Sequence, residues 1–272
     1  MSKEASEMTF LQHLEALRWH VVRTAIAIVS FALIAFFQKE FIFDTIILGP
    51  KNPNFPTYRF LCWLSEKYNL DMCFNKVNFR LISTDISGQF TMHMWVAFVT
   101  GFVIAFPYFV WEMWRFIKPA LSTKEKKYSQ GTVVAVSFLF LTGILFGYFV
   151  ISPMSINFLG NYQVSAEIQN QITLDSYINT VTILSLSAGL VFELPMVVYF
   201  LSKIGILTPE FMRKYRKHAM VINLILAALI TPSPDITSQL LVAFPLFLLY
   251  EISIYVSRVV VRGKIKSEAT NQ

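Results

Sequence analysis

The chain has 272 residues, of which 55% are hydrophobic and only 15% are charged, and its formal net charge is +6. Soluble domains carry about a quarter charged residues, and so apolar a surface would leave large hydrophobic patches in water. The composition therefore excludes a soluble domain and predicts an integral membrane protein. The basic excess then reflects Lys and Arg placed around a bilayer, and no nucleic-acid partner is expected.

No cleavable signal peptide is expected in residues 1–19, because they lack a continuous apolar core and a small-residue cleavage site. Phe10, Leu14, Leu17 and Val21 instead recur at helical spacing. We expect a cytoplasmic amphipathic helix over residues 1–19 that runs along the membrane surface into the first span.

Six apolar segments predict an all-α fold with six transmembrane helices, since a helix needs roughly 20 apolar residues to cross the bilayer. We expect spans at about residues 20–37, 90–114, 130–152, 178–202, 218–231 and 237–257, with an outer loop over 38–89. The fifth apolar core, Ala219–Ile230, reaches only about 18 Å. Either the bilayer thins around it or other protein covers it. A re-entrant hairpin of the last two segments is the alternative.

Charge placement predicts the orientation. Most of the 23 Lys and Arg residues lie in the N-terminal segment, in residues 112–130 and 202–218, and in the tail 258–272. The rest lie in the outer loop, whose length makes its charge nearly irrelevant to topology. Both termini are therefore expected on the cytoplasmic side of a bacterial inner membrane.

The outer loop holds both cysteines of the chain, Cys62 and Cys73. Two thiols on the oxidising side of a membrane favour a disulfide, and two unpaired thiols are the alternative.

Catalytic patterns are not found, so we expect no enzyme, no cofactor and no metal site. The sequence has no HExxH, GxSxG or P-loop pattern, and interfacial positions explain its four scattered histidines. Glu112, between Trp111 and Trp114, is expected to be an exposed carboxylate at the inner interface.

Glu193 falls within an apolar segment, where a charge is costly and must face protein or water. Pro195 follows it and predicts a kink. Either the acid is buried and hydrogen-bonded to a neighbouring helix, or it serves a partner helix or a proton.

Residues 115–128 form a strongly basic loop that contains a single acid, Glu125. Ser122-Thr-Lys-Glu125 matches a capping box before the third span, which explains the acid. The surrounding cations indicate a surface that holds an anion or discriminates among cations.

Four segments, HLEALR, FPYFVWEMWRFIKPALSTKEKK, FELP and TPSPDITSQLLVAFPLFLLYE, resemble the TatC family in one order over residues 8–257. This family supplies the multi-spanning receptor of the twin-arginine protein translocase. The resemblance implies a cup-like fold of six helices, the last two short, and a site for signal peptides with consecutive arginines.

The resemblance places Glu125 at one of two cytoplasmic carboxylates that receive the arginine pair, with Lys118 nearby. The family motif H-L-x-E-L-R has its acid where this chain has Ala16. Glu15 is one residue earlier, about 100° around a helix, and can pair with Arg18 instead. Either the helix rotates, another acid substitutes, or the pocket is weaker here.

The resemblance also gives roles to other residues. Glu193 matches the family's intramembrane acid, and Asp235 and Gln239 match the outer D-x-x-S-Q pattern near partner helices. By the same resemblance, Pro50 is expected at the first outer bend, and Pro107 and Pro119 are expected to flank the inner loop.

We therefore expect a receptor and scaffold that assembles TatA- or TatB-like single-span proteins into an oligomeric complex and exports folded proteins with the proton gradient. A proton-coupled transporter of a small solute, built around Glu193, is the alternative.

Overall fold

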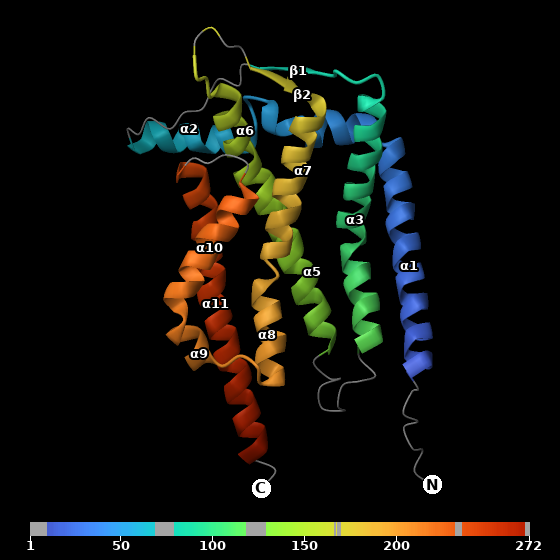
Figure 1. Ribbon diagram of the computed structural model, residues 1–272, viewed down its shortest axis with the longest axis vertical. Helices are drawn as coiled ribbons and strands as arrows, with labels where there is room; N and C mark the ends of the chain where they lie inside the picture. Colours follow the sequence, from blue (N-terminus) through green and yellow to red (C-terminus); the bar gives the residue numbers. More distant parts are fainter. Residues whose placement is uncertain are drawn as a thin grey trace. The chain divides into compact units, whose positions relative to one another are not determined.

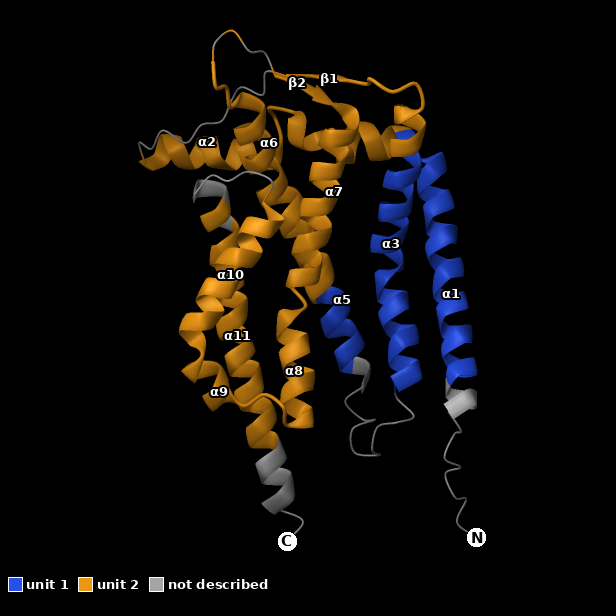
Figure 2. Cartoon of the chain, in the orientation of Figure 1, with its two compact units in different colours: residues 1–39, 93–138 blue, residues 40–92, 139–272 orange. Residues whose placement is uncertain are grey.

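The computed structural model describes residues 10–68, 79–117, 129–165, 167, 170–231 and 236–269, most of which are helical (Figure 1). The chain divides into two compact units (Figure 2). Unit 1 comprises residues 1–39 and 93–138, and unit 2 comprises residues 40–92 and 139–272. Each unit is described by itself.

Unit 1 is a pair of long helices followed by the first turns of a third. They are α1 (Phe10–Phe37), most of α3 (Gly88–Ile117) and the start of α5 (Ser129–Phe146). Gly101 of α3 lets α1 approach closely, because a Cβ there would lie 2.7 Å from the Cα of Ala32. His93 of α3 hydrogen bonds through Nε2 to the backbone oxygen of Phe36 at 3.0 Å, near the other end of α1.

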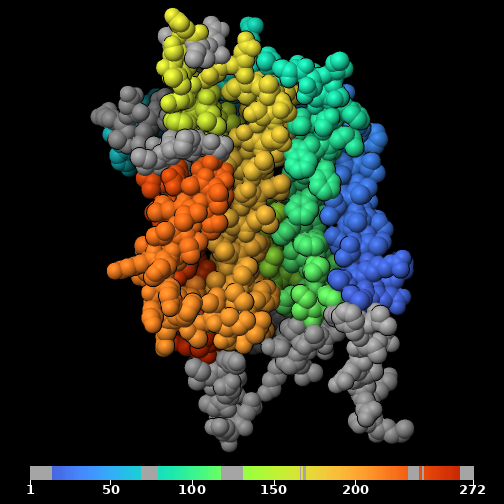
Figure 3. Space-filling view, in the orientation of Figure 1, coloured from blue at the N-terminus to red at the C-terminus, as the bar shows by residue number. Residues whose placement is uncertain are grey.

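Helix α1 (blue in Figure 3) exposes apolar side chains on the surface of unit 1. Ile26, Leu33 and Ile34 are each more than half exposed. Exposed apolar side chains at helical spacing are expected where a helix faces lipid. The apolar segment of α1 is Leu14–Phe37.

The part of unit 2 that corresponds to the expected outer loop and its surroundings, called the outer part below, is built around tyrosine hydroxyls. It contains η1 (Phe41–Ile47), η2 (Gly49–Lys51), α2 (Pro56–Tyr68) and α6 (Ser152–Asn161). Tyr148 donates to the Ile46 oxygen at 2.6 Å, and Tyr177 donates to the Ile47 oxygen at 2.9 Å. The fully buried Tyr58 contacts the backbone oxygens of Pro50 and Pro153, each at 2.9 Å, and burial raises the pKa of its phenol. These bonds tie the tyrosine hydroxyls to the backbone of the short helices η1, η2 and α6.

Two short strands also belong to this outer part. The strand β1 (Arg80–Ile82) pairs in parallel with β2 (Gln171–Thr173), with Arg80 opposite Gln171. The expectation of an all-helical chain omits this pair, because a strand of three residues is too short to show the alternating polar and apolar pattern by which strands are predicted. Cys62 of α2 is disulfide-bonded, and Cys73 lies outside the described residues.

The remaining helices of unit 2 pack around a small-residue core. They are the end of α5, η4 (Gly147–Ile151), α7 (Leu174–Val191), α8 (Leu194–Ile204), α9 (Pro209–Lys214), α10 (Arg216–Ile230) and α11 (Ile236–Ala269). Ala227 of α10 and Ala243 of α11 are fully buried beside Ala188 of α7. Gly143 and Gly147 cross α7 so closely that a Cβ at either would meet its backbone.

In the part of the chain that the structure describes, five helical segments are long and apolar enough to cross a membrane: Leu14–Phe37, Gly88–Ile117, Gly131–Asn161, Leu174–Ile204 and Val242–Gly263. The expected fifth span is α10, whose 15 residues reach about 22 Å. The expected sixth span is the apolar part of α11, a helix of 34 residues that continues into the expected tail. Residues 10–19, expected as part of a surface helix, are continuous with the first span in α1.

Candidate functional site

The N-terminal half of α1 and the C-terminal end of α3 meet in a partly buried polar network centred on the buried Glu112. Its carboxylate hydrogen bonds to His20 Nδ1 of α1 and accepts the hydroxyl of Tyr108 at 3.0 Å. Arg115 lies 3.5 Å from the same carboxylate. Glu112 is 1% exposed, so the expectation of an exposed carboxylate is wrong. A carboxylate with three donors can be buried because its oxygens are satisfied.

The α1 face that meets Glu112 is formed by residues one turn apart. Ala16 and His20 are half-buried, and Thr24 is buried. Glu15 and Arg18 are exposed. Glu15 therefore does not share the orientation of position 16, where the family motif has its acid.

Arg115 already has two interaction partners within this network. Its guanidinium lies 4.7 Å from the ring centroid of Trp111, and it also pairs with Glu112. Glu125, Lys118 and Pro119 lie outside the described residues. The segment that contains them joins Ile117, at the end of α3, to Ser129, at the start of α5.

Glu193 occupies the break between α7 and α8. It is the residue before α8, and Pro195 stands in the first turn of that helix. Glu193 is half-buried, and its Oε1 atom has no hydrogen-bond partner in the described part of the chain. The expected kink is a short interruption of the helix, with the Glu193 carbonyl accepting the backbone N–H of Met196 at 2.9 Å.

The remaining site residues of the sequence analysis are dispersed. Gln239 donates to the backbone oxygen of Leu224 at 3.2 Å, which ties α11 to α10. Pro50 lies in η2 and Pro107 lies inside α3. Asp235 is outside the described residues.

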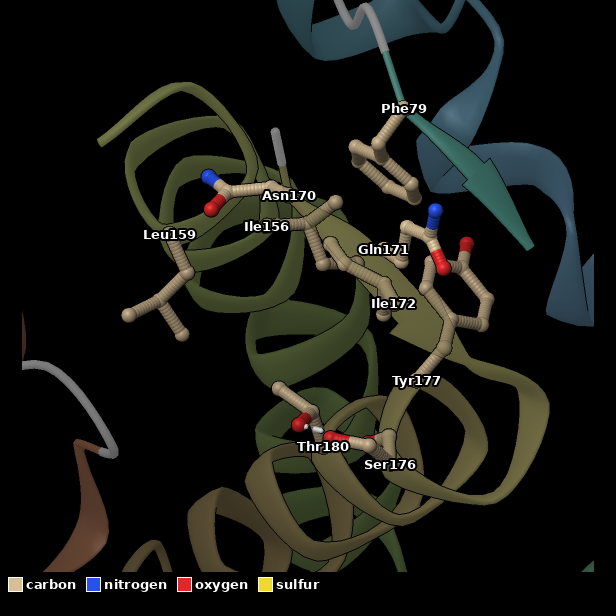
Figure 4. A pocket seen from close by; sticks show the side chains of 9 residues that line it. All are labelled: Phe79, Ile156, Leu159, Asn170, Gln171, Ile172, Ser176, Tyr177 and Thr180. Carbon is tan, nitrogen blue, oxygen red and sulfur yellow. Dashed lines mark hydrogen bonds between the residues drawn. The ribbon is translucent and has the colours of Figure 1, made fainter. Parts of the chain in front are cut away.

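A pocket of about 290 Å³ lies between the second half of α6 and the start of α7, beside β2 (Figure 4). Asn170 and Gln171 contribute amides, Ser176 and Thr180 contribute polar groups, and Phe79 is among the apolar residues that line the rest. Since the lining has no acid or base, this pocket does not suit recognition of charged arginines.

A cavity beside the α7–α8 break has a volume of only about 10 Å³. Phe146, Phe192 and Leu246 are among its apolar lining residues. A space of this size holds at most one water molecule, so it offers no room for a transported solute. Within the described residues, no group of three or more His, Cys, Asp or Glu side chains could hold a metal ion.

His20 and Tyr108 are the members of the Glu112 network that the sequence analysis did not select. The spacing of Tyr108 and Glu112, four residues apart on one helix, is a readable signal. The partnership of Glu112 with His20 is not readable, because 92 positions separate them.

The model of the family described as Sec-independent protein translocase protein (TatC) matches residues 12–245. The chain is 40% identical over 267 residues to Sec-independent protein translocase protein TatC of Blattabacterium sp. subsp. Periplaneta americana, covering 97% of this chain and 100% of that protein. It is 32% identical over 260 residues to the protein of the same name from Aquifex aeolicus, covering 94% and 98%.

Solved structures agree with these relatives. A crystal structure of the twin arginine translocase receptor TatC matches with a TM-score of 0.67 and 30% identity, covering 91% of this chain and 99% of that chain. A second structure of that receptor, in DDM, matches with a TM-score of 0.69 and 31% identity, covering 90% and 99%. The chain belongs to the TatC family of Sec-independent protein translocase proteins.

Proposed function

We propose that this protein is the receptor of a twin-arginine translocase and binds signal peptides with consecutive arginines at the inner end of unit 1. The proposal rests on one observation, namely that unit 1 brings together the charged and hydrogen-bonding residues that such a site would use. It contains the exposed Glu15 and Arg18 of α1, the Glu112 network, and both helices that flank the segment of Glu125.

Glu125 is proposed to accept an arginine of the signal. A guanidinium presents a planar fork of donors that a carboxylate accepts with two bonds, whereas a lysine presents a point charge. The cations around Glu125 in the sequence would repel signals rich in lysine, so that selectivity comes from repulsion as well as attraction. Lys118 and Arg18 are proposed as members of that basic surface.

The Glu112 network supports this site by positioning rather than by contact. Its carboxylate is buried and already holds Tyr108 and His20, so it fixes the end of α1 against the end of α3. The ends of two helices that carry a binding site must be held rigidly for the site to be preorganised.

We further propose that unit 2 contacts single-span partners of the TatA and TatB type within an oligomeric complex. The short helix α10 presents a stripe of exposed apolar side chains, Ile222, Ile225 and Leu229. A helix that is too short to span the bilayer can be accommodated by packing against a neighbouring helix. Glu193, Gln239 and Asp235 would act at this partner surface, and the proton gradient would drive export through the assembled complex.

The proposed location is the bacterial inner membrane, with both termini cytoplasmic. The basic residues of α9 and of the start of α10, and those at the end of α11, then lie on the cytoplasmic side, as positive-inside placement requires.

The test is binding of a labelled twin-arginine signal peptide to the full-length protein in nanodiscs, with a twin-lysine peptide as the competitor. Glu125→Gln is expected to weaken twin-arginine binding by about tenfold to a hundredfold, the loss of a hydrogen-bonded charge pair. Glu66→Gln, which removes an exposed acid of α2, is the matched control and should bind as wild type does.

Equal binding of both peptides by the wild type would contradict the receptor proposal. Selective binding that survives Glu125→Gln would instead leave the receptor function in place and remove Glu125 from its site.

A further inference from the structure

A basic cavity of about 380 Å³ opens in unit 2 where α9 packs beside α11 (Figure 1). Arg213 of α9 lines it together with Arg258 and Arg262 of α11. The one acid in its lining is Glu210. Three guanidinium groups against one carboxylate leave the cavity with a net charge of about +2.

Hydrogen bonds between helices hold the backbone next to two of these arginines, Arg213 and Arg258. Tyr250 of α11 donates its hydroxyl to the backbone oxygen of Met212 at 2.8 Å, immediately before Arg213. Ser202 of α8 donates to Ser257 at 2.7 Å, immediately before Arg258. Met212, Ser202 and Ser257 are all buried, so α8, α9 and α11 hold the arginine positions from within the protein.

Among the described residues, no ion pair neutralises the arginines of this cavity. Close by, Arg216 of α10 pairs with Glu251 of α11 at 2.8 Å. None of Arg213, Arg258 and Arg262 forms an ion pair with another residue that the structure describes. Unpaired arginines that share one cavity can each direct donors at the same anion, and guanidinium matches phosphate geometry.

The cavity lies at the level where the apolar segments end. The apolar segment of α8 ends at Ile204, and that of α11 ends at Gly263. Within two positions of the lining residues in sequence, Ile206, Phe211 and Val259 are at least half exposed. Apolar side chains beside unpaired arginines at a span end match a ligand with an anionic head and an apolar tail.

We propose that this cavity binds the headgroup of an anionic glycerophospholipid of the phosphatidylglycerol type, with the phosphate held by Arg213 and Arg258. Glu210 accepts hydroxyl groups of the glycerol headgroup, and the acyl chains lie over Phe211 and Val259. A zwitterionic lipid is disfavoured because its ammonium group would meet a cavity that is already positive. Free inorganic phosphate would gain nothing from the apolar surroundings. The site is independent of signal-peptide binding.

The experiment is native mass spectrometry of the full-length protein in detergent, titrated with phosphatidylglycerol or with phosphatidylcholine. Wild type is expected to retain phosphatidylglycerol selectively. The variant Arg213→Gln/Arg258→Gln is expected to bind it about fivefold more weakly for each arginine removed. The matched control, Lys214→Gln/Lys217→Gln, removes the same charge from exposed positions of α9 and α10 that do not line the cavity, and it should bind as wild type does.

Three results would overturn the proposal. The first is equal retention of both lipids by the wild type. The second is an equal loss in the arginine variant and the lysine control, which would show a diffuse charge effect. The third is displacement of bound phosphatidylglycerol by millimolar inorganic phosphate, which would assign the cavity to a soluble anion. Unfolding of the arginine variant is checked by its thermal midpoint, and Arg262→Gln then provides a milder change in the same cavity.

Discussion

His20 of α1 and Glu112 of α3 share a partly buried hydrogen bond across 92 positions of sequence. Glu112 lies near the end of α3, shortly before the basic segment that contains Glu125. Tyr108 and Arg115 also contact its carboxylate. One carboxylate therefore connects the two helices that flank the proposed peptide site. Its removal should affect both stability and binding.

We predict that Glu112→Ala lowers the free energy of unfolding by about 1–3 kcal/mol, since His20 and Tyr108 lose a buried acceptor. Glu112→Gln keeps one acceptor oxygen and should cost less. Thermal unfolding in detergent measures both. In the Glu112→Ala background, Tyr108→Phe should add almost nothing, because its partner is already gone. Full additivity of the two substitutions would show that the network is not a unit.

A second prediction concerns the position of the missing family acid. Ala16 lies one turn before His20 on the same face of α1, and Glu15 is exposed away from that face. Ala16→Glu should therefore place a carboxylate at the inner end of unit 1 and strengthen twin-arginine peptide binding by about fivefold or more, the scale of one charged contact. Glu15→Gln should change binding less than about twofold.

Equilibrium binding in nanodiscs checks this pair of variants. The reverse order, with Glu15→Gln the damaging change and Ala16→Glu inert, would mean that α1 rotates in the bound state and that Glu15 is the second acceptor.

Much of the membrane part could be predicted from the sequence. Hydropathy and length locate the apolar segments, and the shortness of the fifth, Ala219–Ile230, follows from counting residues. These properties are local, so a window of about 20 residues contains all the information they need. The family, too, follows from four short segments in register.

The burial of Glu112 could not be predicted in this way. The position of the acid between Trp111 and Trp114 is typical of an interfacial residue. Burial of the carboxylate becomes favourable only because His20, from a helix distant in sequence, hydrogen bonds to it. The outer tyrosines present the same difficulty. Tyr148 and Tyr177 bind carbonyls more than 100 positions away, and no periodicity encodes such partners.

A third prediction tests the outer part of unit 2. A Cβ at Gly49 would lie 2.7 Å from the Tyr148 hydroxyl, which donates to Ile46. Gly49→Ala should therefore destabilise the protein by about 1–3 kcal/mol, the cost of overpacking. Tyr148→Phe removes the hydroxyl and should relieve part of this cost, although it also removes a hydrogen bond.

Thermal unfolding of the two single variants and the double variant gives the coupling energy directly. The double variant should be more stable than the sum of the single changes allows. Strict additivity would show that Gly49 is required for another reason, for which the neighbouring Phe55 ring, 3.2 Å from the same Cβ position, is the first candidate.

The last prediction separates the two interpretations of Glu193. Its Oε1 atom has no hydrogen-bond partner among the described residues, and the hydrogen bond of its carboxyl to the backbone of Phe140 is one that an amide can also make. A charge inside a span costs about 2.5–3.5 kcal/mol on insertion scales, and an acid kept there against that cost is expected to serve function. Glu193→Gln should therefore leave the thermal midpoint unchanged or raise it, while export of a twin-arginine precursor falls at least about tenfold. Glu251→Gln, which breaks an exposed pair with Arg216, is the control and should leave export intact. A lower midpoint with normal export would show instead that Glu193 is a structural residue of the α7–α8 break.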